Sequence, residues 1–154
     1  MPGTTRSRTI AAPPEEVWAL VSDPYNLPRW WPRTLRVEGV EGNGAGAQWT
    51  NVLGTAEGRG VRADFRCTDS VEAERYGWEQ QVEGTPFERH LRGSSTQVLL
   101  RVDGEATEVE LRSSQSLRGL SRLGSPMMRR GQAATLDEAL DGIERALGGE
   151  ADGQ

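Results

Sequence analysis

The sequence predicts a single α+β domain in which an antiparallel sheet of seven strands packs on one long helix near the C-terminal end. Three observations predict this fold class. Apolar residues recur every three or four positions between Leu120 and Leu147, which is the spacing of one helix face. Between residues 35 and 117, apolar and polar residues alternate instead, as they do in strands with one buried side. The length of 154 residues is that of one domain, and the chain contains no internal repeat.

The N-terminal segment is expected to form one strand and two short helices. Residues 5–10 predict the strand. Residues 11–21 predict the first helix, since prolines at its entry suit the first turn and the two glutamates that follow complement the helix dipole. Asp23–Pro24 ends that helix. Residues 25–32 contain two further prolines and a pair of tryptophans, which predict one or two helical turns.

Six further segments alternate between apolar and polar residues, and each predicts a strand. The side chains expected to point inward are, strand by strand, Leu35 and Val37; Ala47, Trp49, Asn51 and Leu53; Val61, Ala63, Phe65 and Cys67; Tyr76, Trp78, Gln80 and Val82; Val98, Leu100 and Val102; and Thr107, Val109, Leu111, Ser113, Gln115 and Leu117. Glu41–Gly46 and Asp103–Gly104 predict turns. One apolar and one polar side per strand is typical of an antiparallel sheet with one face in water.

The last long stretch predicts the helix on which the sheet packs. Ser125–Pro126 indicates a start or a kink, and Gly148–Gly149 indicates the end, so the helix is about 33 Å long. The middle of its buried side carries the small residues Gly131, Ala134 and Thr135. Helix and sheet therefore either pack closely at this point or leave space between them. We expect one domain over residues 5–147, with disordered tails at 1–4 and 148–154.

Composition and charge exclude several classes of function. Hydrophobic residues make up 35% of the chain, and 19 glycines suggest many turns and strand ends. The net charge of -5 argues against a general nucleic-acid-binding protein, because such proteins bind chiefly by neutralising phosphates. The longest apolar run, residues 17–21, is too short to cross a bilayer, and residues 1–8 lack the apolar segment of a signal peptide. These features predict a cytoplasmic protein with no stable membrane insertion.

The sequence offers few ligands for a metal. A single cysteine, Cys67, excludes an internal disulfide and a thiolate metal cluster. With His90 as the only histidine, a zinc site would depend mostly on carboxylates. The glycines of residues 42–46 are followed by an alternating strand instead of a helix, so they do not form a nucleotide-binding loop. We expect neither a metal nor a cofactor.

One segment resembles a known family. Residues 10–23, with the sequence IAAPPEEVWALVSD, are similar to the opening strand and helix of the START-like superfamily, also called SRPBCC. Within this superfamily, the segment resembles the bacterial polyketide cyclase/dehydrase branch. Trp30–Trp31–Pro32 falls where that family has a tryptophan-containing turn, and residues 104–111 resemble its last hairpin before the long helix. The resemblance covers about residues 5–147.

The resemblance implies the helix-grip fold, in which a curved antiparallel sheet wraps round the C-terminal helix with a cavity between them. Members of the superfamily bind hydrophobic molecules such as lipids, sterols, plant hormones and polyketides, and some catalyse cyclisation or dehydration. No stretch of this sequence aligns securely with the catalytic positions of the cyclases. The resemblance therefore implies a binding cavity and assigns no catalytic residue.

Some residues predicted to point inward are polar. They are Asn51, Gln80, Thr107, Ser113 and Gln115. A buried polar group needs a hydrogen-bond partner, so these side chains either bond to one another or to trapped water, or they contact a ligand in a mostly apolar pocket. Individually each is more simply explained by internal bonding, whereas the set as a whole favours a pocket.

The aromatic residues are either core or cavity wall. Trp49 and Trp78 point inward by strand phase, while one of the adjacent Trp30 and Trp31 is expected near the cavity mouth. Met127 and Met128 would fill gaps or adapt to varied ligands. The candidate ligand-binding residues are therefore Trp30, Trp31, Trp49, Asn51, Phe65, Trp78, Gln80, Ser113, Met127, Met128 and Gly131.

The candidates for catalysis are His90, Arg92 and Gln115. If side chains alternate without interruption back from Val98, His90 and Arg92 point to the inner side of the sheet. If they alternate from Phe87, both residues point outward, so the direction of their side chains stays open. If His90 points inward, it can act as an acid or base near neutral pH. The alternative is a structural or surface imidazole, which we prefer because no nucleophile is identifiable beside it.

The leading hypothesis is an intracellular binding protein that holds a small, largely hydrophobic molecule, such as a lipid, a polyketide or an aromatic compound, between sheet and helix. The alternatives are a polyketide cyclase, aromatase or dehydratase that uses polar cavity residues, and a co-chaperone-like module that binds other proteins. Arginines at 118, 122, 129 and 130 precede the acids of the long helix and form either a charged outer face or a site for an anionic partner. The sequence does not distinguish a monomer from a homodimer.

Overall fold

The computed structural model describes residues 3–54, 60–89, 91–117 and 125–152. Its seven strands form one antiparallel sheet in the order β1-β7-β6-β5-β4-β3-β2. The elements in chain order are β1 (Gly3–Ile10), α1 (Pro14–Val21), η1 (Pro24–Asn26), α2 (Leu27–Trp30), β2 (Thr34–Glu41), β3 (Gln48–Gly54), β4 (Gly60–Val71), β5 (Arg75–Gln80), η2 (Pro86–Arg89), β6 (Leu91–Asp103), β7 (Ala106–Leu117) and α3 (Ser125–Asp152). The predicted α+β fold, with two short helices after the first strand, is confirmed.

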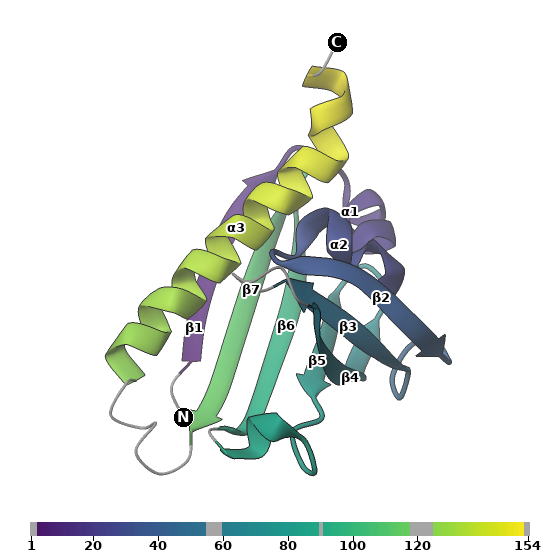
Figure 1. Cartoon of the computed structure of the whole chain (residues 1–154). Helices are drawn as coiled ribbons and strands as arrows, with labels where there is room; N and C mark the ends of the chain where they lie inside the picture. The colour runs from purple at the N-terminus through teal and green to yellow at the C-terminus, as the bar shows by residue number, and fades with distance from the viewer. Residues whose placement is uncertain (1–2, 55–59, 90, 118–124, 153–154) are drawn as a thin grey trace.

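The sheet curves round α3, which crosses one of its faces (Figure 1). Strands β2 to β7 follow one another as antiparallel neighbours, and β1 joins the far edge of β7 with Gly3 opposite Ser114 and Ile10 opposite Thr107. Helix α3 packs mainly on β1, β7 and α2. The strands β3, β4 and β5 curl round on the other side of the molecule, so α3 covers only part of the concave face (Figure 1).

The core lies where α1, α2 and the second half of α3 meet the sheet. On α3, Leu136, Leu140 and Ile143 are buried, as predicted from the helical spacing. Gly142 lies so close to α2 that a Cβ atom there would be 2.3 Å from the carbonyl oxygen of Trp30. A Cβ atom at Gly131 would meet no atom of the described residues within 4 Å. The helix therefore packs closely at one of these glycines and leaves open space at the other.

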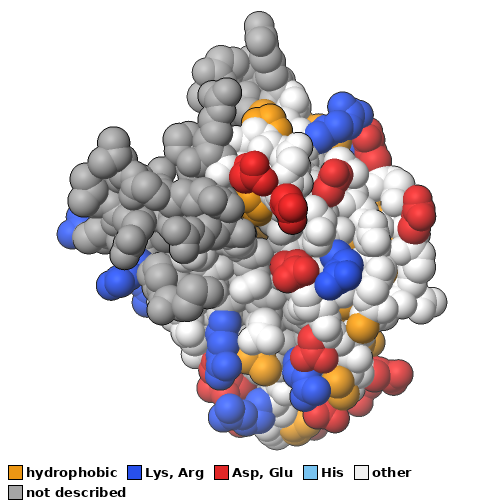
Figure 2. Space-filling model, turned by 90° about the horizontal axis from the view of Figure 1, so that it is seen from below, with side chains coloured by type: hydrophobic (Ala, Val, Ile, Leu, Met, Phe, Trp, Pro, Cys, Tyr) orange, Lys and Arg blue, Asp and Glu red, His pale blue; other side chains and the backbone are white. Residues whose placement is uncertain are grey.

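Ion pairs fasten α3 to the edge strand β1. Arg8 contacts Asp141 at 2.6 Å and Glu144 at 2.8 Å, and Arg6 lies 3.7 Å from Asp137. The pKa of the Arg8 guanidinium is raised, first by its hydrogen bond to Asp141. Three of the acids on α3 thus belong to a contact between helix and sheet. Arginine and acidic side chains lie next to one another over the face in Figure 2, and they are not separated into regions of one sign.

Several boundaries and directions differ from the prediction. The first strand begins at Gly3 because β7 extends far enough to pair with it. Helix α3 continues past Gly148–Gly149 to Asp152, since glycine in a helix interior costs only about 1 kcal/mol and no proline follows. The one-turn helix η2 was not predicted.

Three residues predicted to point inward are exposed. Leu35 is 54% exposed because the β2–β3 pairing shifts between Thr34 and Arg36, so that Thr34 is buried in its place. Val61 and Val102 are 37% and 68% exposed, and each lies near the end of its strand. The side chain of Leu117, and the predicted helix residues Leu120 and Leu123, lie outside the described residues, as do Arg118 and Arg122.

Candidate functional site

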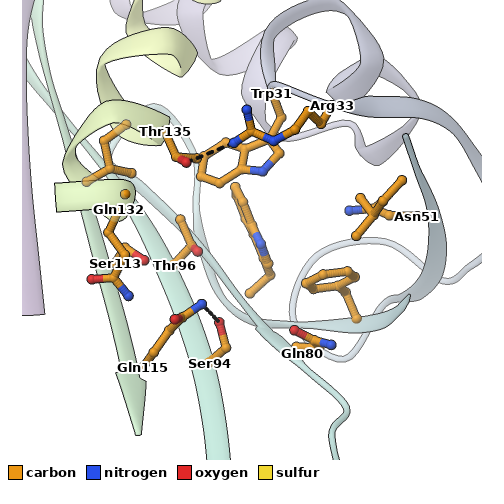
Figure 3. Close-up of a pocket in the computed structure, with 15 residues that line it drawn as sticks. Trp31, Arg33, Asn51, Gln80, Ser94, Thr96, Ser113, Gln115, Gln132 and Thr135 are labelled. Carbon is orange, nitrogen blue, oxygen red and sulfur yellow. Dashed lines mark hydrogen bonds between the residues drawn. The ribbon is translucent and has the colours of Figure 1, made fainter. Parts of the chain in front are cut away.

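A pocket of about 430 Å³ lies between the sheet and the first half of α3 (Figure 3). It lies on the concave face of the sheet, beside the open space at Gly131 on α3. Its volume is in the usual range for small-molecule sites. The described residues that line it are Trp31, Arg33, Asn51, Leu53, Phe65, Trp78, Gln80, Ser94, Thr96, Ser113, Gln115, Gly131, Gln132, Thr135 and Leu136.

Aromatic rings form one wall of the pocket. Trp31 and Trp78 meet edge to face with ring centroids 5.4 Å apart, and Phe65 lines the pocket from β4. Trp30 and Trp49 support this wall from behind: the ring of Trp30 contacts Trp31, and that of Trp49 stacks on Phe65. Because these rings hold one another in place, the wall offers a rigid apolar surface to a flat molecule.

Polar side chains form the opposite wall. On β6 and β7, Ser94 pairs with Gln115 and Thr96 pairs with Ser113, so the four side chains form a patch on the inner face (Figure 3). Within the patch, Gln115 Nε2 donates to Ser94 Oγ at 3.4 Å. Gln132 adds its amide from α3 (Figure 3). This wall can donate and accept hydrogen bonds along much of its length.

Three buried amide atoms of the pocket have no hydrogen-bond partner. They are Asn51 Oδ1, Gln80 Nε2 and Gln132 Nε2, and they make up half of the six such side-chain atoms in the described part of the chain. An unpaired buried polar atom costs about 1–3 kcal/mol, and in native proteins such an atom usually bonds to a group that the protein does not supply. Their concentration in one pocket indicates a place for a polar ligand or for ordered water.

Arg33 is the only ionisable residue among the described lining residues. Its Nη2 donates to Thr135 Oγ1 on α3 at 3.0 Å, and its Nη1 lies 3.6 Å from a carboxylate oxygen of Glu138. Its backbone has a φ of 62°, a conformation that non-glycine residues seldom adopt. The Arg33 side chain is about half exposed and therefore lies where the pocket meets solvent.

Most of the predicted site residues lie at this pocket. Trp31, Phe65, Trp78 and Gly131 line it, together with the polar residues Asn51, Gln80, Ser113 and Gln115. Trp30 and Trp49 were also predicted to contact a ligand, but both are buried behind the aromatic wall and do not line the pocket. Thr107 is buried and donates to the carbonyl of Ala12 at 2.7 Å, as the interpretation of internal bonding requires.

Four predicted residues cannot be placed. His90 lies outside the described residues, and so do the side chains of Arg92, Met127 and Met128.

The described part of the chain contains no helix long and apolar enough to cross a membrane. Among the same residues, no group of three His, Cys, Asp or Glu side chains is arranged to hold a metal ion.

Seven lining residues were absent from the predicted site: Arg33, Leu53, Ser94, Thr96, Gln132, Thr135 and Leu136. Strand alternation places Leu53 on the same side as Asn51, and Ser94 and Thr96 on the same side as Val98. The sequence therefore did indicate that these three side chains point inward. Gln132 lies four positions before Leu136, and this spacing indicates that the two side chains share one face of the helix. Arg33 had no comparable signal, because its direction depends on a single unusual φ angle.

The family model described as "Polyketide cyclase / dehydrase and lipid transport" matches residues 1–148. No curated protein matches the sequence closely enough to count as a relative.

Solved structures resemble the fold over nearly the whole chain. TTHA0849 from Thermus thermophilus superposes with a TM-score of 0.74 at 22% identity, covering 94% of this chain and 95% of that one. A START superfamily protein from Mycobacterium smegmatis gives 0.72 at 13% identity, with 92% and 94% covered. The di-domain ARO/CYC StfQ from the steffimycin biosynthetic pathway gives 0.78 at 12% identity, with 99% of this chain and 52% of StfQ covered.

At these identities the structural likeness establishes the fold, and the family model establishes the family. The curved seven-stranded sheet with its C-terminal helix is the helix-grip fold of these structures. The chain therefore belongs to the polyketide cyclase/dehydrase and lipid transport family.

Proposed function

We propose that this protein binds a small molecule in the pocket between the sheet and α3, with an apolar side of the ligand against the aromatic wall and polar groups against the opposite wall. The observation that carries the proposal is the group of three unpaired buried amide atoms in one pocket of about 430 Å³. A ligand with hydrogen-bonding groups would pair atoms that the fold leaves unpaired.

The two walls refine the expected ligand. The sequence predicted a largely hydrophobic molecule, but eight uncharged polar side chains from β3, β5, β6, β7 and α3 line the pocket: Asn51, Gln80, Ser94, Thr96, Ser113, Gln115, Gln132 and Thr135. A plain hydrocarbon chain would leave their polar atoms desolvated and unpaired, which opposes binding. An aromatic molecule with oxygen or nitrogen substituents fits both walls better.

The described lining residues favour binding over acid–base catalysis. Arg33 is their only ionisable group, and a guanidinium does not release its proton near neutral pH. The likeness to the ARO/CYC structures concerns the fold, and the catalytic candidates His90 and Arg92 lack described side chains. The expected location in the cytoplasm stays a prediction.

A substitution that fills the pocket tests the proposal. We expect an uncharged two-ring probe, 2-naphthamide, to bind the wild type in isothermal titration calorimetry. Gly131→Leu should reduce its affinity at least tenfold, because the new side chain enters the open space beside the pocket.

Gly148→Leu is the matched control, since it makes the same change on the same helix, away from the pocket, and also meets open space. This variant should bind 2-naphthamide like the wild type. Equal binding by the wild type and both variants would place the probe elsewhere and contradict the proposal. Retention of a protein partner by Gly131→Leu, without any binding of the probe to the wild type, would support a protein-binding module instead.

A further inference from the structure

The pocket has an excess of hydrogen-bond donors on the side of α3. The unpaired atom of Gln132 there is an amide nitrogen, and the charged group of the pocket is the guanidinium of Arg33, which reaches α3 at Thr135. No aspartate or glutamate is among the described lining residues. A ligand group that binds at this side must therefore accept hydrogen bonds, and a negative charge on it would be balanced by Arg33.

The backbone of Arg33 holds the side chain at this position. With its φ of 62°, the residue is in the left-handed region, which raises its conformational energy. In this conformation its carbonyl accepts a hydrogen bond from the backbone N–H of Gly54 at 2.7 Å, and its side chain crosses to Thr135 on α3 (Figure 3). Strain that other contacts hold in place is common at binding sites.

The guanidinium of Arg33 has N–H groups that remain available for a ligand. Of its five N–H groups, one bonds to Thr135 Oγ1. Glu138 is 3.6 Å away, beyond hydrogen-bond distance, and both of these charged side chains are about half exposed, so their attraction is weakened by solvent. An anion in the pocket can therefore bind Arg33 without first displacing a strong internal partner.

Gln132 is set up to donate at the same side. It lies three positions before Thr135 on α3, so the two side chains share one helix face, and both point toward the pocket in Figure 3. The side-chain oxygen of Gln132 accepts from the hydroxyl of Thr4 on β1 at 3.0 Å. That contact orients the amide and leaves Nε2, which is buried and unpaired, as a donor for a ligand.

We propose that the natural ligand carries a carboxylate that Arg33 binds, while Gln132 donates to a separate acceptor on the ligand and the rest of the molecule lies against the aromatic wall. The planar carboxylate offers two oxygens that match the guanidinium fork. This inference rests on the proposed binding function and assigns Arg33 as the residue that determines specificity.

A pair of probes that share one ring system tests the inference. We expect the wild type to bind 2-naphthoate about tenfold more tightly than 2-naphthamide in calorimetry, because only the first carries a charge for Arg33. Arg33→Gln should remove that preference, so that its affinities for the two probes lie within about twofold of each other. Arg36→Gln removes the same charge three residues away, from an exposed side chain that does not line the pocket, and should keep the preference.

The outcomes separate the two proposals. Equal affinity of the wild type for both probes, or a preference that survives in Arg33→Gln, would overturn the carboxylate site and leave ligand binding intact. Failure of the wild type to bind either probe would overturn the proposed function and this inference with it. If Arg33→Gln does not fold, Arg33→Gly replaces it, because glycine adopts a positive φ without strain.

Discussion

Thr107 and Asn51 are buried polar residues on the inner face of the sheet, and their polar atoms are treated in opposite ways. The hydroxyl of Thr107 donates to the carbonyl of Ala12, whereas Asn51 Oδ1 has no partner and its residue lines the pocket. The first arrangement stabilises the fold. The second lowers stability unless a ligand or water supplies a donor, as is common at sites that serve function before stability.

Replacing these two residues by apolar ones should have different effects on the free energy of unfolding. We expect Thr107→Val to lower it by about 1–3 kcal/mol, because the carbonyl of Ala12 loses its buried donor. Asn51→Leu should leave it unchanged or raise it by up to about 1 kcal/mol, since no internal hydrogen bond of Oδ1 is lost. Urea denaturation measures both. A loss in Asn51→Leu equal to that in Thr107→Val would show that Asn51 is a structural residue.

Strand phase predicts that Thr107 and Asn51 point inward, but it does not tell which of them has a partner. The partner of Thr107 is 95 positions away in sequence, at the turn before α1, and only the fold brings it close. The position of Arg33 is even harder to predict from the sequence, because it depends on one backbone angle and on contacts with β3 and α3. Such residues are settled by tertiary contacts that a single sequence does not contain.

At the scale of elements, α3 combines two kinds of packing in one helix. Near Gly142 its backbone lies against the backbone of Trp30 in α2, and Arg8 holds its outer side to β1. Near Gly131 it borders the pocket. The helix is thus packed tightly against α2 at one end and borders open space at the other.

Adding one methyl group at Gly142 should therefore destabilise the protein far more than the same change at Gly148. In Gly142→Ala the new carbon would lie within 3 Å of three backbone atoms of Trp30, which cannot move aside as a flexible side chain can. We expect a loss of about 3 kcal/mol in the free energy of unfolding. Gly148→Ala meets open space and should raise stability by up to about 1 kcal/mol, as alanine favours the helix. Comparable small effects in both variants, measured by thermal or urea denaturation, would contradict the close packing of α2 and α3.

The spacing of apolar residues predicted six of the seven strands and the long helix, because it reflects which side of each element is buried. It predicted a stretch of small residues around Gly131 on α3, but it did not identify Gly142 as the point of close contact with α2. The sequence alone does not distinguish Gly131 from Gly142, because the difference lies in what each contacts in the fold. In β2 it failed at Leu35, where a shift in register turns the side chain outward. Bulges of this kind follow from the pairing of two strands and are not visible in one of them.

At the scale of the whole molecule, one end of the sheet is filled and the other is hollow, with Trp78 at the boundary. Trp78 lines the pocket, and its ring centroid lies 6.0 Å from that of Tyr76, two residues earlier on β5. Tyr76 in turn contacts Trp18 of α1 edge to face and lies beside the buried Cys67. The filled end therefore contains two weak acids, a phenol and a thiol, with no role in the pocket.

Burial raises the pKa of both groups, because the low-polarity core disfavours their charged forms. In the unfolded chain a tyrosine loses its proton near pH 10 and a cysteine near pH 8.5, while the folded protein keeps both protons to higher pH. Above these values the unfolded state binds fewer protons than the folded state. The contribution of these two protonated groups to the free energy of unfolding is therefore complete below about pH 8. It is lost as the pH rises through their pKa values in the unfolded chain toward their pKa values in the folded protein.

We expect the free energy of unfolding to be level between about pH 7 and 8 and to fall steadily from about pH 9 upward, as measured by urea denaturation at each pH. Tyr76→Phe should make this fall shallower, because the variant keeps the ring and removes the buried phenol. Tyr25→Phe is the matched control: Tyr25 is 56% exposed, and its loss should leave the slope unchanged. Since neither group lines the pocket, the affinity for 2-naphthamide should stay constant until the protein unfolds. An equal change of slope in both variants would mean that the filled end does not hold Tyr76 away from water, and the division of the molecule into a filled and a hollow end would be wrong.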